Sequence, residues 1–159
     1  MSDATQSERP SRRELSSAAR FYAVQALFQM EAASQSADKV GGEFLSWRIG
    51  IETEDGAMPD ADKNLFTGIL DNVVTWQARI DQLTDRALVA KWPIGRIDPV
   101  LRAVFRAAGA ELVAAKAPPR VVISEYLRVA EAFFTDGRET RFVNAVLDHM
   151  AHEVRPEGF

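Results

Sequence analysis

The 159-residue chain contains no cysteine and only two histidines. Without cysteine it can form neither a disulfide nor a thiolate metal site, and it has no cysteine nucleophile. His149 and His152 would lie one helical turn apart, but two ligands without a third do not make a metal site. We therefore expect no metal centre.

Long apolar runs and phosphate-binding loops are missing as well. No stretch approaches the roughly 18 apolar residues of a membrane span, and the opening MSDATQSERPSRRE lacks the apolar core of a signal peptide. Gly41 and Gly42 are not followed by the Lys-Ser or Lys-Thr pair of a nucleotide-binding loop. These absences predict a cytoplasmic protein that is not an enzyme, needs no cofactor and makes no membrane contact.

Charge is distributed unevenly along the chain, although its net value is only −4. Between residues 9 and 30 four arginines face Glu14 alone, whereas residues 41–62 carry six carboxylates against Arg48. A basic segment in a mildly acidic protein is typical of a chain that meets an anionic partner at one place. A merely solvated face is the simpler alternative.

Apolar residues recur with the 3.6-residue period of a helix almost throughout, and no stretch alternates long enough to predict a strand. The sequence therefore predicts an all-α fold of six or seven helices in two groups. The expected helices cover about residues 11–31, 39–49, 61–90, 98–117, 120–134 and 137–154. The stripe of the long third helix includes Trp76, and in the second helix we expect Trp47 to be buried.

Local signals mark several helix ends. Ser11 followed by Glu14 is the pattern of a capping box, and Asp98 with Pro99 is typical of a cap and first helical residue. Gly137 suits a left-handed turn before the last helix. The segment KWPIG, residues 91–95, is expected to be a hinge because proline and glycine interrupt helices.

The first helix carries a basic stripe on the side away from its apolar face. It is formed by Arg9, Arg13, Ser16 and Arg20, with Arg12 and Ser17 adjoining. Cations at a helix N-terminus are disfavoured by about 0.3–1 kcal/mol each, a cost that a bound phosphate would reverse. Arginine binds phosphates and base edges, and aromatic rings stack on unpaired bases. The stripe predicts binding of single-stranded RNA, with Phe21 and Phe28 nearby; core packing is the simpler alternative for Phe28.

Three ordered stretches resemble the NusB family of transcription antitermination factors. They are AARFYAVQALFQME (18–31), RIDPVLRAVFRAAGAEL (96–112) and APPRVVISEYLRVAEAFFTDGRETRFVNAVLDHMA (117–151), whose FVNAVLD is similar to the family's FVNGVLD signature. The resemblance implies two packed helical bundles and no catalysis. On this basis we expect a flexible basic arm over 1–10 and one domain over 11–154, with halves of about 11–92 and 96–154.

The resemblance also implies binding partners. Proteins that resemble this chain bind the single-stranded boxA RNA of ribosomal RNA operons together with NusE, a ribosomal protein, within the transcription elongation complex. Carried onto this chain, the resemblance and the basic stripe together assign expected contacts. The RNA-binding residues would be Arg12, Arg13, Arg20, Gln25, Phe28, Arg106 and Phe142. The partner-binding residues would be Arg102, Arg138, Arg141 and Phe142.

The chain departs from the family pattern at two places. Many members carry arginines immediately before the AR pair, where this chain has Leu-Ser-Ser at 15–17, so Arg9, Arg12 and Arg13 are candidates to replace them. Ala145 stands where the signature has glycine. The alternatives are a helical protein-interaction module and a module associated with ribosomal RNA methyltransferases, whose N-terminal domains it also resembles. Both a monomer and a homodimer remain open.

Overall fold

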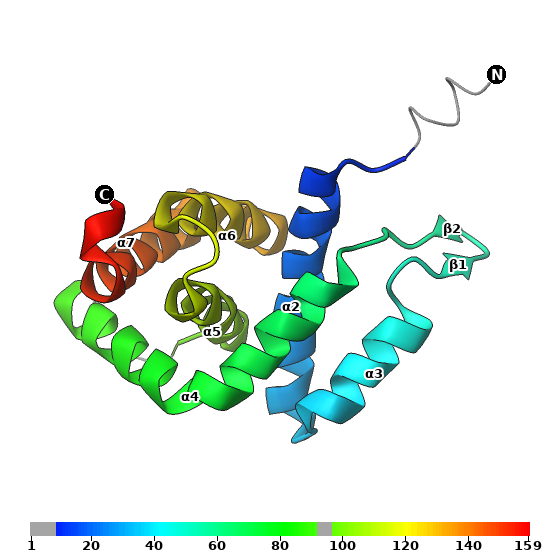
Figure 1. Cartoon of the computed structure of the whole chain (residues 1–159), viewed down its shortest axis with the longest axis horizontal. Coiled ribbons are helices and arrows are strands. Elements are labelled where there is room, and N and C mark those ends of the chain that lie inside the picture. Colours follow the sequence, from blue (N-terminus) through cyan, green and yellow to red (C-terminus); the bar gives the residue numbers. More distant parts are fainter. Residues whose placement is uncertain (1–8, 92–96) are drawn as a thin grey trace.

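The computed structural model describes residues 9–91 and 97–159, and these residues are predominantly helical (Figure 1). Most of the expected N-terminal arm and all but Lys91 of the expected KWPIG hinge lie outside the described residues. The elements are α2 (Arg12–Ala33), α3 (Ala37–Trp47), β1 (Glu52–Thr53), β2 (Gly56–Ala57), α4 (Lys63–Lys91), α5 (Pro99–Ala114), α6 (Pro119–Phe133), α7 (Gly137–Val154) and a 3₁₀ turn, η1 (Pro156–Gly158). The all-α prediction is confirmed.

Helix α2 lies between α3 on one side and α5 and α6 on the other (Figure 1). It packs against α3 and α4 on one side and against α5 and α6 on the other. Helix α5 is enclosed by α2, α4, α6 and α7, and the buried apolar residues of helices α2 to α7 form one core. The N-terminal end of α2 extends beyond this core, so its first turn is exposed beside α6 and the hairpin.

The predicted caps begin two of these helices. Ser11 Oγ accepts a hydrogen bond from the Glu14 amide at 3.1 Å, and Glu14 Oε1 accepts one from the Ser11 amide at 3.2 Å. At the start of α5 the Asp98 side chain accepts from the Val100 amide at 2.7 Å, with Pro99 as the first helical residue. Because each cap contributes about 0.5–2 kcal/mol, local sequence is enough to begin α2 and α5.

The start of α7 differs from the prediction. Asp136 is the cap, accepting from the Arg138 amide at 2.9 Å, and Gly137 is the first residue of the helix. Among the described residues, the glycines with positive φ are Gly50 and Gly56, not Gly137. Gly56, at φ +114°, belongs to the short β1–β2 hairpin inside the acidic segment. Helical periodicity gave no signal for a hairpin of this length.

Two tryptophans expected in the core are exposed. Trp47, the last residue of α3, is 76% exposed, because α3 buries Val40, Gly41 and Phe44 instead. Trp76 is 44% exposed and has non-helical backbone angles of φ −113° and ψ 17°, which bend α4 at this residue. The bend interrupts the regular helical stripe and leaves Trp76 outside the core. The prediction of burial was wrong for both residues.

One ionic cluster is buried where α2, α5 and α6 meet. Arg20 on α2 is only 7% exposed, and its Nε and Nη2 donate to the two carboxylate oxygens of Glu111 on α5 at 2.8 and 3.0 Å. The Tyr126 hydroxyl of α6 donates to Glu111 Oε2 at 2.6 Å. Burial, together with the Glu111 carboxylate, raises the pKa of Tyr126 well above its ordinary value of 10.0. The Glu111 carboxylate thus connects three helices.

Replacing Arg20→Ala should lower the free energy of unfolding by about 3–5 kcal/mol, because it leaves the Glu111 carboxylate buried without its cation. Urea denaturation followed by circular dichroism measures this loss. The matched control is Arg86→Ala, which removes an equally close pair with Glu153, at 2.8 and 2.9 Å, on the protein surface. The control should cost much less, because solvent screens an exposed ion pair. Equal losses in the two variants would contradict a special role for the buried pair.

Tyr126→Phe should lower the free energy of unfolding at pH 8 by roughly 1.5–3 kcal/mol, because it removes one hydrogen bond to the charged Glu111 carboxylate. The pKa of Tyr126 is raised in the folded state, so its contribution is complete below about pH 10 and declines as the pH rises further. The stability difference between the two proteins should therefore narrow in urea denaturations above pH 10. Tyr22, whose pKa is also raised, is present in both and cancels. A difference independent of pH would contradict this account.

Candidate nucleic-acid interface

Exposed arginines gather at the beginning of α2. Arg12 and Arg13 occupy its first turn, and Arg9 precedes the Ser11 cap, so Arg9 does not continue the helical stripe as predicted. Arg13 is 73% exposed, and its Nε lies 3.9 Å from Glu125 Oε1 on α6. Within the described part of the chain, Arg12 makes no side-chain ion pair or hydrogen bond. These cations are available to an anionic ligand.

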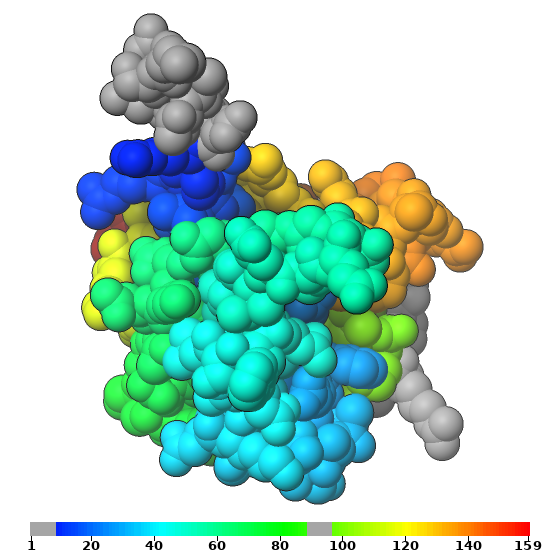
Figure 2. Space-filling view, turned by 90° about the vertical axis from the view of Figure 1, so that its right-hand side faces the viewer, coloured from blue at the N-terminus to red at the C-terminus, as the bar shows by residue number. Residues whose placement is uncertain are grey.

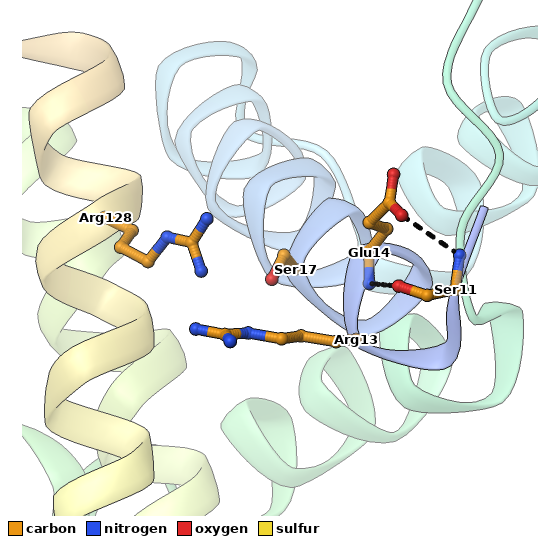
Figure 3. Close-up of a pocket in the computed structure, with 5 residues that line it drawn as sticks. All are labelled: Ser11, Arg13, Glu14, Ser17 and Arg128. Carbon is orange, nitrogen blue, oxygen red and sulfur yellow. Dashed lines mark hydrogen bonds between the residues drawn. The ribbon is translucent and has the colours of Figure 1, made fainter.

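A surface cleft of about 620 Å³ lies between the start of α2 and the middle of α6. It is lined by Ser11, Arg13, Glu14, Ser17 and Arg128. Figure 3 shows the side chains of Arg13 and Arg128 extending toward one another from the two helices, with Ser17 beside them. Sequence reasoning missed Arg128, because the pattern of α6 places it on an exposed face without indicating which helix that face meets.

Glu125 lies beside this cleft, one turn before Arg128 on α6. Its side chain accepts a hydrogen bond from the Ser17 hydroxyl at 2.9 Å, and the residue is only 7% exposed. The same carboxylate is the nearest acidic group to Arg13 in the described structure. Glu125 therefore holds the start of α2 against α6.

Arg20 does not reach the surface that the sequence predicted for it. The helical projection placed it on the basic stripe, but that side of α2 is covered by α5 and α6, and Glu111 binds its guanidinium group. In this structure the Arg20 guanidinium group is buried and is not exposed for the RNA contact that the sequence predicted. Arg20 lies in the interior below the exposed arginines, where it links α2 to α5 through Glu111.

Gln25 and Phe28 line a second hollow, a groove of about 410 Å³ farther along α2. Phe28 is 38% exposed, so it is not a core residue. Phe133 of α6 lies in the same groove and is stacked on Phe21, with ring centroids 4.9 Å apart. The full lining is Val24, Gln25, Phe28, Gln29, Ala32, Ala33, Arg48, Val100 and Phe133. A groove lined by aromatic rings together with amide and guanidinium groups can accept a planar unpaired base.

Arg102 and Arg106 on α5 are engaged within the chain. Arg102 forms a bidentate pair with Glu31 at the end of α2, which lowers the pKa of that carboxyl. Arg106 donates to both oxygens of Asp81 on α4 at 3.2 Å and to Glu31 at 3.3 Å. Two carboxylates thus neutralise the two arginines. In this structure the cluster connects α2, α4 and α5.

Of the four residues expected to contact a partner, Arg102 lies on α5, whereas Arg138, Arg141 and Phe142 lie near the start of α7, part of which protrudes at the right of Figure 2 (orange). Arg138 is exposed and is paired with Asp136 at 3.4 Å, and Arg141 is exposed as well. Phe142 is half-buried, with its ring 5.9 Å from that of Phe105. None of the three lines the cleft or the groove described above.

The C-terminal histidines have structural surroundings. His152 Nδ1 lies 2.8 Å from the Asp148 carbonyl oxygen, and the His152 ring stacks on Phe159. In the described residues no group of three or more histidine, cysteine, aspartate or glutamate side chains could hold a metal ion. No helix within 9–91 or 97–159 has the length and apolar character needed to cross a membrane.

Three comparisons with known proteins all match this chain to the NusB family. The model of the NusB family matches residues 17–152. "Transcription antitermination protein NusB" of Granulibacter bethesdensis is 46% identical over 148 residues, which cover 89% of this chain and 90% of that protein. The protein of the same name in Rhodopseudomonas palustris is 45% identical over 143 residues, covering 89% and 84%. The solved structure of T. maritima NusB superposes with a TM-score of 0.70 at 29% identity, covering 95% of this chain and 97% of that one. The chain therefore belongs to the NusB family of transcription antitermination proteins, as its three matching stretches predicted.

Proposed function

We propose that this protein is a cytoplasmic transcription antitermination factor that binds the boxA element of ribosomal RNA transcripts together with NusE. The observation that carries the proposal is the group of exposed arginines at the start of α2 in a member of the NusB family. A phosphate placed there interacts favourably with both the guanidinium groups and the helix N-terminus. In the free protein the arginines are repelled by the positive end of the helix dipole. In the complex the bound phosphate is attracted by both the arginines and the helix end.

In this proposal two parts of the surface bind different parts of the RNA. The start of α2, with Arg12 and Arg13, binds the phosphate backbone. The groove farther along the same helix stacks a base on Phe28 and offers the Gln25 amide to the base edge. Because both parts lie on α2, one short single strand following this helix can meet phosphate contacts first and a base contact farther along.

NusE binding is assigned in this proposal to the start of α7. Arg138 and Arg141 project there from the first turns, and Phe142 supplies a partly exposed ring. Arg102 and Arg106 join a partner or RNA only by exchanging their carboxylates, Glu31 and Asp81, for ligand groups. We therefore expect these two arginines to contribute less to binding than Arg12, which pairs with no residue of the described structure.

Titration of boxA single-stranded RNA, with and without NusE, tests the proposal. RNA affinity should be modest for the protein alone and should increase when NusE is added. Each phosphate neutralised contributes about −0.7 to the slope of log affinity against log salt for a single strand, so the binding should weaken steeply with salt. If NusE raises neither the affinity nor the preference for boxA over a scrambled RNA, the proposal fails.

Variants in the same titration locate the binding surface. Phe28→Ala should weaken RNA binding by about fivefold or more through loss of stacking. Trp47→Ala is the matched control, because Trp47 is an exposed aromatic residue on α3 that does not line the groove. Equal effects of the two substitutions would place the base contact elsewhere.

A further inference from the structure

Two arginines from different helices face each other across the cleft between α2 and α6. Figure 3 shows Arg13 reaching from α2 and Arg128 from α6 into the same space. Within the described residues Arg128 makes no side-chain ion pair or hydrogen bond, and the carboxylate of Glu125 approaches Arg13 no closer than 3.9 Å. Like charges in this arrangement repel one another, and an anion between them converts that repulsion into attraction.

Glu125 fixes the geometry of this pair. It is buried on α6, it binds the Ser17 hydroxyl, and it draws the flexible Arg13 side chain toward α6. Arg128 follows one turn later on the same helix, so the guanidinium groups are brought together before any ligand binds. Glu14 also lines the cleft, but its carboxylate is engaged in the capping box with Ser11. With two carboxylates nearby, the cleft suits one singly charged group better than a highly charged ligand.

The exposed side of α2 has no other cation to offer beyond Arg13. Ser16 and Ser17 follow it, and Arg20 is buried against Glu111. An RNA strand that runs from Arg12 toward the groove at Phe28 therefore needs a cation from another element. Arg128 is the exposed cation that lines the cleft from α6.

We propose that Arg13 and Arg128 together bind one phosphodiester group of the RNA, with one guanidinium group on each side of it. This inference rests on the proposed RNA-binding function. A phosphodiester carries a single negative charge on two non-bridging oxygens, and the planar fork of arginine donates parallel hydrogen bonds to such oxygens. The RNA backbone then bridges α2 and α6, and the residue that makes this possible lies more than a hundred positions from the basic stripe in the sequence.

A double-mutant cycle on the full chain tests the shared phosphate. Arg13→Ala, Arg128→Ala and the double variant are titrated with boxA single-stranded RNA in the presence of NusE at several salt concentrations. Each single substitution should weaken binding by about threefold to tenfold. The double variant should lose clearly less than the product of the two single losses, because both residues bind one group. Arg79→Ala, which removes an exposed arginine of α4, is the control for net charge and should change affinity little.

The outcomes separate this inference from the proposed function. If Arg128→Ala binds RNA as tightly as the natural chain while Arg12→Ala and Phe28→Ala bind it weakly, the shared phosphate is wrong and RNA binding stands. Strictly multiplicative losses from Arg13→Ala and Arg128→Ala also overturn it, because they indicate two separate contacts. If Arg12→Ala and Phe28→Ala have no effect either, the proposed RNA surface fails as a whole. Thermal unfolding of each variant verifies that the fold is intact.

Discussion

The arrangement of α2, α5 and α6 depends on the hydrogen bonds that the Glu111 carboxylate accepts. It accepts two hydrogen bonds from Arg20 of α2 and one from Tyr126 of α6, and it lies on α5, the helix enclosed by its neighbours. Apolar packing alone tolerates small shifts of one helix along another. A buried carboxylate with three directed donors restricts such shifts, because a displaced donor leaves a charged group unsatisfied in the core.

The buried cluster also determines how the exposed faces of α2 and α6 lie relative to one another. Ser17 and Arg13 precede Arg20 on α2, and Glu125 is adjacent to Tyr126 on α6. The buried contacts of Arg20 and Tyr126 therefore set the distance between the exposed faces of the two helices, and the Ser17–Glu125 hydrogen bond of 2.9 Å closes the space above them. In this account an internal ionic cluster positions an external cationic one. In the proposed complex Arg20 supports the RNA-binding surface from below and makes no direct contact with the RNA.

Local sequence was sufficient for the helices and insufficient for what covers them. The starts of α2 and α5 were predictable because their caps, Ser11 and Asp98, act on amides two or three residues away. Arg20 was misplaced because a helical projection shows which residues share a side but does not show that α2 is packed on two sides. Its partner Glu111 is 91 positions away. Arg128 was missed for the same reason, since its importance arises only where α6 meets α2. The family resemblance rested on local motifs, and for that reason it was readable from the sequence.

The central claim is that RNA lies across the exposed faces of α2 and α6. Photo-crosslinking of the full chain to boxA RNA carrying photoreactive uridines, with NusE present and the crosslinked peptides identified by mass spectrometry, tests it most directly. The account predicts crosslinks within residues 9–33, which include α2, and within α6, residues 119–133. Crosslinks confined to α3, the β1–β2 hairpin and α4 would contradict it.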